Sequence, residues 1–337
     1  MITHMKAIKF LGNKKLEIID MPKPEPAEGS VLVKVMAASI CRTDLELLYN
    51  QPQKTDIIPG HEVAGIIEKV NKVKGFKKGD RVFLNVHITC GKCEFCGAGD
   101  WIFCPELSCI GSDHDGGDAE YMIAQEGILR KLPDDISFEL GSLISDAFGT
   151  PYHAVKAAGL KKSDQLGIIG MGPLGLAAVI IASGYDAKVF AIDPIEERLG
   201  LARKFGAVEI LDPLKNNIKK SIKEKTRGYG LDVVIDCTGS EDAIKMGLDI
   251  LKVRGKFIFV GVCTDLNLNT FDHVISKELM LIGSRNFNEN ELGEIIGLVR
   301  KNPQIKNMIT HRFSFSQAKK AFRIADERKG IKIILGP

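Results

Sequence analysis

The feature that most constrains the fold is a regular alternation of apolar runs and helical segments between about residues 165 and 260. Short runs rich in Val, Ile and Phe are each followed by a turn and then by a helical pattern. Such alternation is typical of a parallel sheet covered on both faces, because parallel strands need crossover helices. The predicted strands are Gln165–Ile169, Lys188–Ile192, Glu209–Leu211, Asp232–Asp236 and Lys256–Val260, and the predicted helices are Leu174–Ser183, Ile195–Phe205, Ile218–Thr226 and Asp242–Leu251.

The segments on either side of this region follow a different pattern. Before it, short strands such as Val31–Val35, Val63–Val70 and Arg81–Leu84 alternate with Pro/Gly turns, which predicts β structure. The last fifty residues are too few for a separate domain, so we expect them to return to the β-rich part. They contain the predicted elements Glu289–Arg300 (helix), His311–Phe313 (strand), Ser316–Arg328 (helix) and Ile331–Leu335 (strand).

Length and charge narrow the class of protein. A chain of 337 residues predicts two domains. Lys and Arg number 46 against 43 Asp and Glu, a net charge of +3 without a long basic block, which argues against nucleic-acid binding. No apolar run reaches the ~18 residues that span a bilayer, and the first segment lacks a signal-peptide pattern. We therefore expect a cytoplasmic protein that binds a small molecule and has no nucleic-acid or membrane partner.

A glycine-rich turn follows the first strand of the alternating region. The sequence Gly170-Met171-Gly172-Pro173-Leu174-Gly175 leads directly into a helix. Glycines there permit a tight turn and close approach of the backbone to a pyrophosphate, and the helix N-terminus faces the phosphates. An ordinary strand–helix turn is the alternative. The context favours a dinucleotide site formed by Gly170, Gly172, Pro173, Leu174 and Gly175.

Further cofactor contacts are predicted at the ends of the later strands. Asp193 ends the next strand, eighteen residues after Gly175. An acid there binds both ribose hydroxyls and repels a 2′-phosphate, which favours NAD over NADP. Arg198 is either a ribose contact or a solvated helix residue. By position at strand ends, we also assign to the cofactor site Thr238, Val260, Val262, Ser284 and Arg285.

Four of the eight cysteines lie within fifteen residues. Cys90, Cys93, Cys96 and Cys104 follow the spacing C-x2-C-x2-C-x7-C. Four thiolates at this spacing close a tetrahedron around zinc and leave no open position, which predicts a structural zinc. The alternatives are four free cysteines, or a nucleic-acid-binding zinc ribbon, whose two cysteine pairs normally lie further apart.

A second set of metal-binding side chains is dispersed. Cys41 stands in Cys41-Arg42-Thr43-Asp44, and His61 and Glu62 follow Gly60. Each has an ordinary packing explanation when taken alone. Next to a nicotinamide site, a thiolate, an imidazole and a carboxylate indicate a catalytic zinc with one open position, which polarises an alcohol oxygen.

The order of these motifs along the whole chain resembles the zinc-dependent medium-chain dehydrogenase/reductase superfamily. Within it the chain is similar to the branch of L-threonine 3-dehydrogenases, sorbitol-type polyol dehydrogenases and sugar-acid dehydrogenases. The stretches His87-Ile88-Thr89-Cys90-Gly91 and Ser145-Asp146-Ala147-Phe148-Gly149 are closest to the threonine dehydrogenase pattern.

The resemblance implies a role for each residue of the second set. Cys41, His61 and Asp146 are the implied zinc ligands, and Glu62 binds the metal directly or through water. Asp44 is the implied partner of the second ring nitrogen of His61.

It also implies a route for the proton, in which Thr43 passes on the proton of the alcohol. Three residues later, where many relatives carry a histidine, this chain has Glu46, so the route to solvent is left open.

The resemblance further implies the architecture. We expect an α/β protein in which residues 1–148 and 288–337 form a GroES-like β-barrel catalytic domain. Residues 149–287 would form a Rossmann domain with a doubly wound parallel sheet. The active site is expected in the cleft between them, with two zinc ions per chain, NAD as cofactor and a homotetramer as the assembly.

The expected reaction is the reversible NAD-dependent oxidation of a secondary alcohol of a polyol or sugar acid to a ketone. Arg285 is a candidate to bind a substrate carboxylate, and His87 and Thr43 are further candidate substrate contacts. L-Threonine is the alternative substrate. A non-enzymatic cofactor-binding protein is the alternative of another class.

Overall fold

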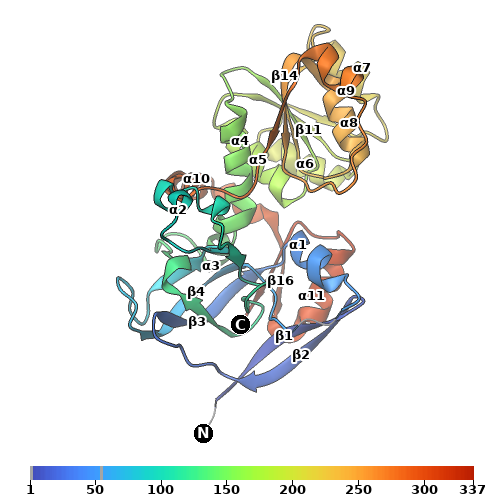
Figure 1. Cartoon of the computed structure of the whole chain (residues 1–337). Coiled ribbons are helices and arrows are strands. Elements are labelled where there is room, and N and C mark those ends of the chain that lie inside the picture. Colours follow the sequence, from blue (N-terminus) through green and yellow to red (C-terminus); the bar gives the residue numbers. More distant parts are fainter. Residues whose placement is uncertain (1–2, 54–55) are drawn as a thin grey trace. The chain divides into compact units, whose positions relative to one another are not determined.

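The computed structural model describes residues 3–53 and 56–337. The chain separates into two compact units (Figure 1). The first unit contains the chain up to Asp146 together with Asn288–Pro337, and the second unit is Ala147–Phe287. The second unit is therefore an insertion between two parts of the first.

The second unit is built on a six-stranded parallel sheet, in which the strands follow the order β12-β11-β10-β13-β14-β15. The order reverses next to β10, which is where ligands bind in open sheets of this kind. The strands are β10 (Gln165–Ile169), β11 (Lys188–Ile192), β12 (Glu209–Leu211), β13 (Leu231–Asp236), β14 (Leu251–Phe259) and β15 (Met280–Gly283).

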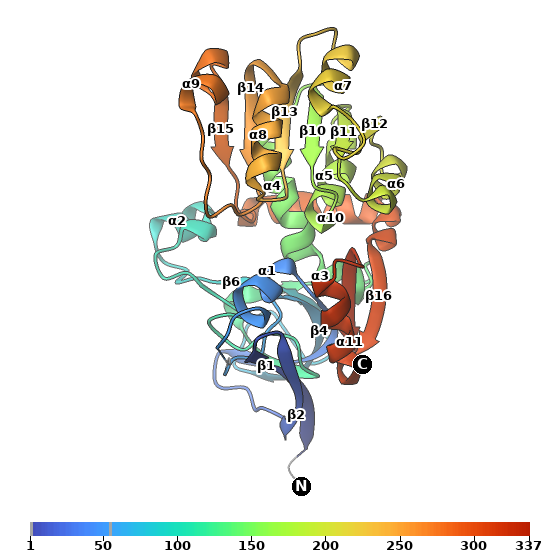
Figure 2. The same ribbon diagram turned by 90° about the vertical axis from the view of Figure 1, so that its right-hand side faces the viewer.

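Helices cover both faces of this sheet, as the turned view makes clear (Figure 2). α4 and α5 lie on one face and α7 and α8 on the other. A continuous apolar core joins the strands to the inner sides of α7 and α8, including Ile222 and Leu248. The helices are α4 (Gly149–Ala158), α5 (Pro173–Ser183), α6 (Glu196–Lys204), α7 (Ile218–Lys225), α8 (Glu241–Ile250) and α9 (Thr270–His273).

The first unit is mainly β structure. Its largest sheet has the order β16-β17-β3-β4-β5-β9, with β8 also paired to β3. β17 runs antiparallel to β3 and parallel to β16, so the end of the chain is part of this sheet. The strands are β3 (Ser30–Ser39), β4 (Glu62–Asn71), β5 (Arg81–Leu84), β8 (Tyr121–Gln125), β9 (Leu129–Lys131), β16 (Ile309–Ser314) and β17 (Lys332–Gly336).

Smaller elements complete the first unit. Two pairs of strands form separate two-stranded sheets: β1 (His4–Gly12) with β2 (Lys15–Pro22), and β6 (His87–Ile88) with β7 (Ser108–Cys109). The helices are α1 (Arg42–Asp44), α2 (Glu94–Ala98), α3 (Phe138–Ser142), α10 (Leu292–Lys301) and α11 (Ala318–Asp326). Leu45–Tyr49 and Ile144–Phe148 are single π-helical turns.

The predicted elements of the second unit lie within a few residues of the observed ones. The main difference is β14, which begins at Leu251, directly after α8, rather than at Lys256. In the C-terminal segment, the predicted helices each begin with a 3-10 turn, Glu289–Glu291 and Phe315–Gln317. The β1–β2 hairpin was not predicted. Across residues 3–53 and 56–337, no helix is long and apolar enough to cross a membrane.

Candidate metal centres and dinucleotide site

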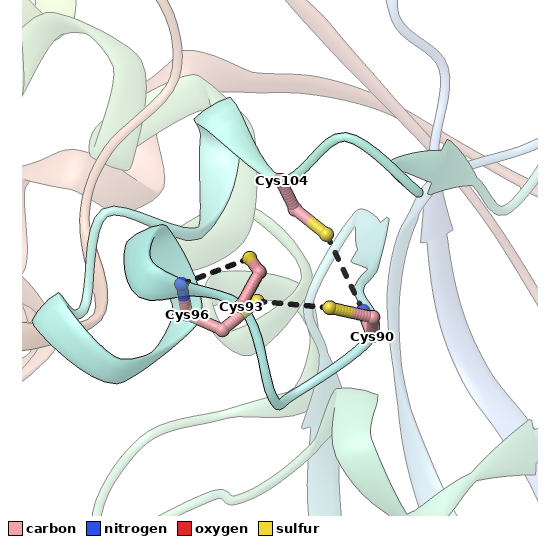
Figure 3. A group of neighbouring side chains, drawn as sticks. All are labelled: Cys90, Cys93, Cys96 and Cys104. Atoms are coloured by element: carbon pink, nitrogen blue, oxygen red, sulfur yellow. Dashed lines mark hydrogen bonds between the residues drawn. The ribbon is translucent and has the colours of Figure 1, made fainter.

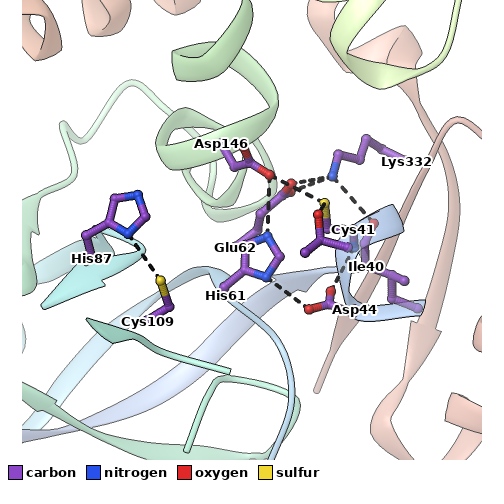
Figure 4. Close-up of polar contacts among 10 residues, drawn as sticks. Ile40, Cys41, Asp44, His61, Glu62, His87, Cys109, Asp146 and Lys332 are labelled. Atoms are coloured by element: carbon purple, nitrogen blue, oxygen red, sulfur yellow. Dashed lines mark hydrogen bonds and ion pairs between the residues drawn. The ribbon is translucent and has the colours of Figure 1, made fainter. Parts of the chain in front are cut away.

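Four potential metal ligands converge in the first unit (Figure 4). Cys41 precedes α1, His61 and Glu62 stand at the start of β4, and Asp146 lies in the π-helical turn Ile144–Phe148. One donor atom from each lies within 4.8 Å of all the others. Oδ2 of Asp146 is 3.4 Å from both Sγ of Cys41 and Nε2 of His61. Zinc with four tetrahedral ligands separates them by about 3.3–3.8 Å, so this donor set fits the ion.

Asp44 orients two of these residues. Its Oδ1 is 2.9 Å from Nδ1 of His61, and its Oδ2 accepts a hydrogen bond from the backbone N–H of Cys41 at 3.0 Å. The side chain of Asp44 is buried. A carboxylate that accepts the Nδ1 proton leaves the lone pair of Nε2 available for a metal. The arrangement is the one expected for the second ring nitrogen of a metal-binding histidine.

The electrostatics of this cluster also suit a cation. Burial raises the pKa of the Cys41 thiol, and the carboxylate of Asp146 raises it further. Burial alone would lower the pKa of His61, but Asp44, Cys41 and Asp146 together raise it well above its usual value. Thiol and carboxylate groups brought this close repel one another when ionised. A divalent cation among them offsets this repulsion and stabilises the thiolate.

Lys332 is a component of the cluster that the sequence analysis missed. It lies on β17, and its Nζ is 2.6 Å from both carboxylate oxygens of Glu62. Both side chains are almost completely buried. Burial alone would lower the pKa of Lys332, but the charges of Glu62 and Cys41 raise it. Lys332 therefore provides a buried positive charge beside a candidate metal ligand.

The three predicted proton and substrate residues of the first unit lie in different surroundings. The hydroxyl of Thr43 is 3.6 Å from Sγ of Cys41, and the residue is exposed. Glu46 accepts a hydrogen bond from Nε of Arg42 at 2.8 Å, and its side chain is 54% exposed. His87 is buried on β6, with Nδ1 3.3 Å from Sγ of Cys109. Thr43 thus borders the cluster, whereas Glu46 is engaged at the surface.

The four cysteines of the predicted structural site form a compact group around α2 (Figure 3). Their sulfur atoms lie within 4.8 Å of one another, and those of Cys90 and Cys96 are 4.0 Å apart. Backbone N–H groups point at two of the sulfurs: Cys90 N–H at Cys104, and Cys96 N–H at Cys93, each at 3.4 Å. A tetrahedral zinc thiolate site requires sulfur separations of about 3.8 Å, so this group also fits zinc.

Other backbone groups of this loop favour the ionised form of one thiol, Cys90. Hydrogen bonds from the backbone at Lys92 and Cys93 lower the pKa of Cys90 to about 7. A thiolate therefore forms there near neutral pH. At Cys93 a backbone hydrogen bond from Cys96 acts in the same direction, but partial burial and the neighbouring cysteines together raise its pKa to about 11. Without a cation the four thiols are therefore not all ionised near neutral pH, and a bound zinc would stabilise the thiolates.

In the second unit, the glycine-rich turn lies between β10 and α5. A Cβ atom on Gly175 would clash with the carbonyl oxygen of Gly170, so close packing of the turn requires glycine there. A Cβ on Gly172, by contrast, would meet no described atom within 4 Å. Gly172 caps α5, whose first residue is Pro173. The open space at a helix N-terminus fits the pyrophosphate of a dinucleotide.

Asp193 is held beside this turn. Its Oδ2 accepts a hydrogen bond from the N–H of Met171 at 2.7 Å, and its Oδ1 accepts one from Ile195 at 2.8 Å. The residue is only 4% exposed. Each oxygen retains a second lone pair, so the fixed carboxylate can still accept a hydrogen bond from a ribose hydroxyl.

The remaining predicted cofactor residues belong to the second unit and vary in exposure. Thr238 donates its hydroxyl hydrogen to Asp236 at 2.6 Å, and Val260 donates its N–H to the carbonyl of Asp236 at 3.0 Å. Asp236 therefore shapes the ends of β13 and β14, a role that was not predicted. The other four are Val262 (85% exposed), Ser284 (half-buried), Arg285 (exposed) and Arg198 (half-buried, on α6).

Two family models match the chain. The alcohol dehydrogenase GroES-like domain matches residues 27–134, and the zinc-binding dehydrogenase model matches residues 173–301. Together with the relatives below, they establish that the chain belongs to the zinc-dependent alcohol dehydrogenase family. It is an oxidoreductase that uses zinc and a nicotinamide cofactor, and the predicted family and fold class are confirmed.

Relatives of known activity match over nearly their whole length. L-Threonine 3-dehydrogenase of Shewanella putrefaciens is 33% identical over 98% of this chain and 99% of its own. D-Arabitol-phosphate dehydrogenase of Enterococcus avium is 32% identical, over 96% and 94% respectively. Sorbitol dehydrogenase of Halalkalibacterium halodurans is 29% identical, over 97% of each chain.

Solved structures agree with this assignment. A putative zinc-binding dehydrogenase from Sinorhizobium meliloti bound to NADP has a TM-score of 0.90 and 27% identity, covering 99% of this chain and 100% of its own. An alcohol dehydrogenase from Escherichia coli CFT073 complexed with NADH has a TM-score of 0.89 and 26% identity, covering 99% of each chain. Structural neighbours thus include both an NADP complex and an NADH complex.

Proposed function

We propose that this enzyme reversibly oxidises a secondary alcohol to a ketone with NAD⁺, acting on a polyol or a sugar acid. The observation that carries the proposal is the convergence of Cys41, His61, Glu62 and Asp146 within 4.8 Å, bordered by the hydroxyl of Thr43. Oxidation of a secondary alcohol releases a proton from oxygen and a hydride from carbon. The hydride goes to C4 of the nicotinamide, and the proton needs an acceptor beside the substrate oxygen.

Each residue of the cluster has a defined task in this proposal. Cys41, His61 and Asp146 would hold the catalytic zinc, which supplies Lewis-acid polarisation of the alcohol oxygen. Asp44 fixes the ring of His61. The Thr43 hydroxyl accepts the proton of the alcohol and donates its own toward solvent, since the residue is exposed.

Glu62 is held by Lys332 and is the fourth candidate ligand. We propose that this ion pair keeps the carboxylate in place beside the metal. The exposed pair of Glu46 and Arg42 lies near the outer end of the proton route, where a carboxylate can exchange protons with water.

A second zinc is proposed at the four cysteines, which gives two ions per chain. Four thiolates complete the coordination of zinc and leave no position for a substrate, so this ion stabilises the fold. The pKa of about 7 at Cys90 supports the assignment.

NAD is the proposed cofactor. The fixed, buried carboxylate of Asp193 supports this, because it is proposed to accept hydrogen bonds from the ribose and to repel a 2′-phosphate. Gly170, Gly172, Pro173, Leu174 and Gly175 provide the turn for the pyrophosphate. Thr238, Val260, Val262, Ser284, Arg285 and Arg198 are proposed to contact other parts of the cofactor.

The proposed substrates follow from the relatives and from two side chains. Sorbitol and arabitol-phosphate dehydrogenases among the relatives favour a polyhydroxy substrate. His87 and the exposed Arg285 are proposed to bind its hydroxyl or carboxylate groups. L-Threonine is the second candidate, favoured by the 33% identity to threonine dehydrogenases and by the His87–Gly91 stretch.

The proposal is tested by an NAD-reduction assay with the zinc-replete enzyme on sorbitol, xylitol, inositol, hexonates, butanediol and threonine. We expect activity on polyols or hexonates, and its loss in Cys41→Ser with NAD binding retained. The reason is that Cys41 and the glycine-rich turn belong to different units. Activity confined to threonine would replace the polyol assignment. Wild-type turnover in Cys41→Ser would refute the zinc mechanism.

A homotetramer in the cytoplasm is proposed as the working form. β15 is an edge strand of the six-stranded sheet, yet its Met280 and Leu281 are 46% and 40% exposed. An apolar edge strand favours pairing with another copy of the sheet. All eight cysteines are unbridged, which suits a reducing compartment.

A further inference from the structure

A cysteine that has no part in either metal group contacts a candidate substrate residue. His87 on β6 and Cys109 on β7 are directly opposite each other in an antiparallel pair. Nδ1 of His87 lies 3.3 Å from Sγ of Cys109 (Figure 4). The figure shows the thiol on one side of the ring and the second ring nitrogen, Nε2, on the other.

This pair is joined to the metal cluster by packed backbone. Gly111, two residues after Cys109, packs so closely on Gly60 that a Cβ on it would lie 2.9 Å from the Gly60 carbonyl carbon. The carbonyl of Gly60 also accepts a hydrogen bond from the N–H of Gly117 at 2.9 Å. Gly60 directly precedes His61. The strand that carries Cys109 is therefore fixed against the turn that carries a candidate zinc ligand.

The direction of the hydrogen bond between thiol and ring follows from the chemistry of both groups. An unprotonated imidazole nitrogen is a good acceptor, whereas a thiol sulfur is a poor acceptor but carries a proton that it can donate. Asp113 accepts a hydrogen bond from the backbone N–H of Cys109 at 2.8 Å. This bond fixes the backbone that carries the thiol. Hence the neutral thiol donates to Nδ1 of His87.

We propose that Cys109 is a positioning residue that holds His87 in the tautomer with the proton on Nε2. His87 then acts as a hydrogen-bond donor to an oxygen of the substrate on the carbon next to the reacting carbinol. This role in substrate selection rests on the proposed alcohol oxidation. It assigns the selectivity for a neighbouring hydroxyl or carboxylate oxygen to the pair of His87 and Cys109.

The tautomer is tested directly by ¹⁵N NMR on histidine-labelled, zinc-replete enzyme at alkaline pH, with the His87 signals assigned by their absence in His87→Gln. We expect the wild type to show an unprotonated Nδ1 and a protonated Nε2. Cys109→Val removes the donor at similar volume and should give a mixture of both tautomers. Cys109→Ser keeps a donor and should restore part of the wild-type pattern.

The effect on specificity is measured with 2,3-butanediol and 2-butanol, which differ in one hydroxyl beside the reacting carbinol. Losing one neutral hydrogen bond lowers kcat/KM by about three- to tenfold. We expect this loss for the diol in Cys109→Val, mainly as a higher KM, and a smaller loss for 2-butanol. Cys263→Val is the matched control, because Cys263 belongs to the second unit and its thiol donates a hydrogen bond to the backbone carbonyl of Asp265, in its own loop, at 3.5 Å.

Two results would overturn the inference: a wild-type His87 with its proton on Nδ1, or equal losses for both alcohols in Cys109→Val. The tautomer measurement requires no turnover. If the enzyme oxidises none of the alcohols, the proposed function is refuted. The NMR result tests the role of Cys109 independently of that outcome.

Discussion

The side chain of Asp118 is the least satisfied polar group near the metal cluster. It is fully buried, and neither carboxylate oxygen has a hydrogen-bond partner within residues 3–53 and 56–337. Burial raises the pKa of Asp118 well above its usual value, and the charge of Asp44 raises it further. A buried carboxyl without partners costs stability once it ionises.

This carboxyl predicts a pH-dependent effect of Asp118→Asn. Because the folded pKa lies above the unfolded one, its contribution to stability is lost as the pH rises from the unfolded pKa through the folded pKa. The amide does not ionise. We therefore expect the melting temperature of Asp118→Asn, relative to that of the wild type, to increase as pH rises from about 5 to 8. Thermal unfolding of the zinc-replete proteins measures this. If the difference in melting temperature between variant and wild type does not change with pH, the carboxyl of Asp118 keeps one protonation state across this range.

Lys332 stabilises the fold, whereas an ionised Asp118 destabilises it. Lys332→Met leaves the Glu62 carboxylate buried without its partner, which typically costs about 3–5 kcal/mol. Lys329→Met is the matched control, because Lys329 forms an exposed ion pair with Glu327, worth at most about 1 kcal/mol. Chemical denaturation measures both losses, and metal analysis follows the zinc content. Lys332→Arg should recover most of the stability. Equal losses in Lys332→Met and the control would show that the pair is energetically neutral.

At the scale of residues, the sequence predicts best what is contiguous in the chain. Cys41 and His61 stand in short motifs whose residue types suit a metal, and the structure brings them together. Lys332 is 270 positions from Glu62, and nothing in its own neighbourhood distinguishes it from the other lysines. Its role depends on the pairing of β17 with β3, which no local pattern reveals.

At the scale of elements, buried strands were easier to predict than half-exposed ones. β10, β11 and β13 are nearly continuous apolar runs, because both faces of the parallel sheet are covered. The β1–β2 hairpin was missed because both strands carry several charged residues, and β2 has a single buried residue, Leu16. Its turn has Asn13 and Lys14 at positive φ, which favours Asn but is unusual for Lys.

The four-cysteine loop around α2 is predicted to hold a zinc ion that can be removed without loss of the other one. Cys93→Ser removes one of four thiolates and should release one zinc per chain and lower the melting temperature, because such sites contribute folding free energy. Metal analysis and thermal unfolding measure both effects. The control is Cys237→Ser, which lies outside both groups of candidate ligands. A wild-type enzyme with a single zinc after metal loading would refute the four-cysteine site.

The end of β11 predicts cofactor selectivity. In Asp193→Ser the hydroxyl cannot supply the charged hydrogen bonds, each worth about 1.5–3 kcal/mol, so NAD affinity should fall roughly ten- to a hundredfold. Discrimination against NADP should relax at the same time. Titration of both cofactors into wild type and variant checks this. If the wild type already prefers NADP, the assignment of Asp193 is wrong.

At the scale of the whole molecule, the exposed edge of β15 predicts self-association. A charge on an edge strand opposes pairing with another sheet. We therefore expect Leu281→Lys to dissociate the assembly into smaller species, as measured by sedimentation. Lys252→Glu, on the adjacent β14, is the control for a charge change elsewhere on the unit. A wild type that sediments as a monomer would refute the proposed tetramer.

The buried pair of Glu62 and Lys332 also sets an order of events during synthesis. Translation proceeds at about 5–20 residues per second, so the 270 positions between them take about 15–50 s. Throughout this interval β4 exists without β17, and Glu62 lacks its counter-ion. The inserted second unit is made entirely within the same interval. The second unit is thus complete on the ribosome before the largest sheet of the first unit can close, and the counter-ion of Glu62 is present only once Lys332 has been made.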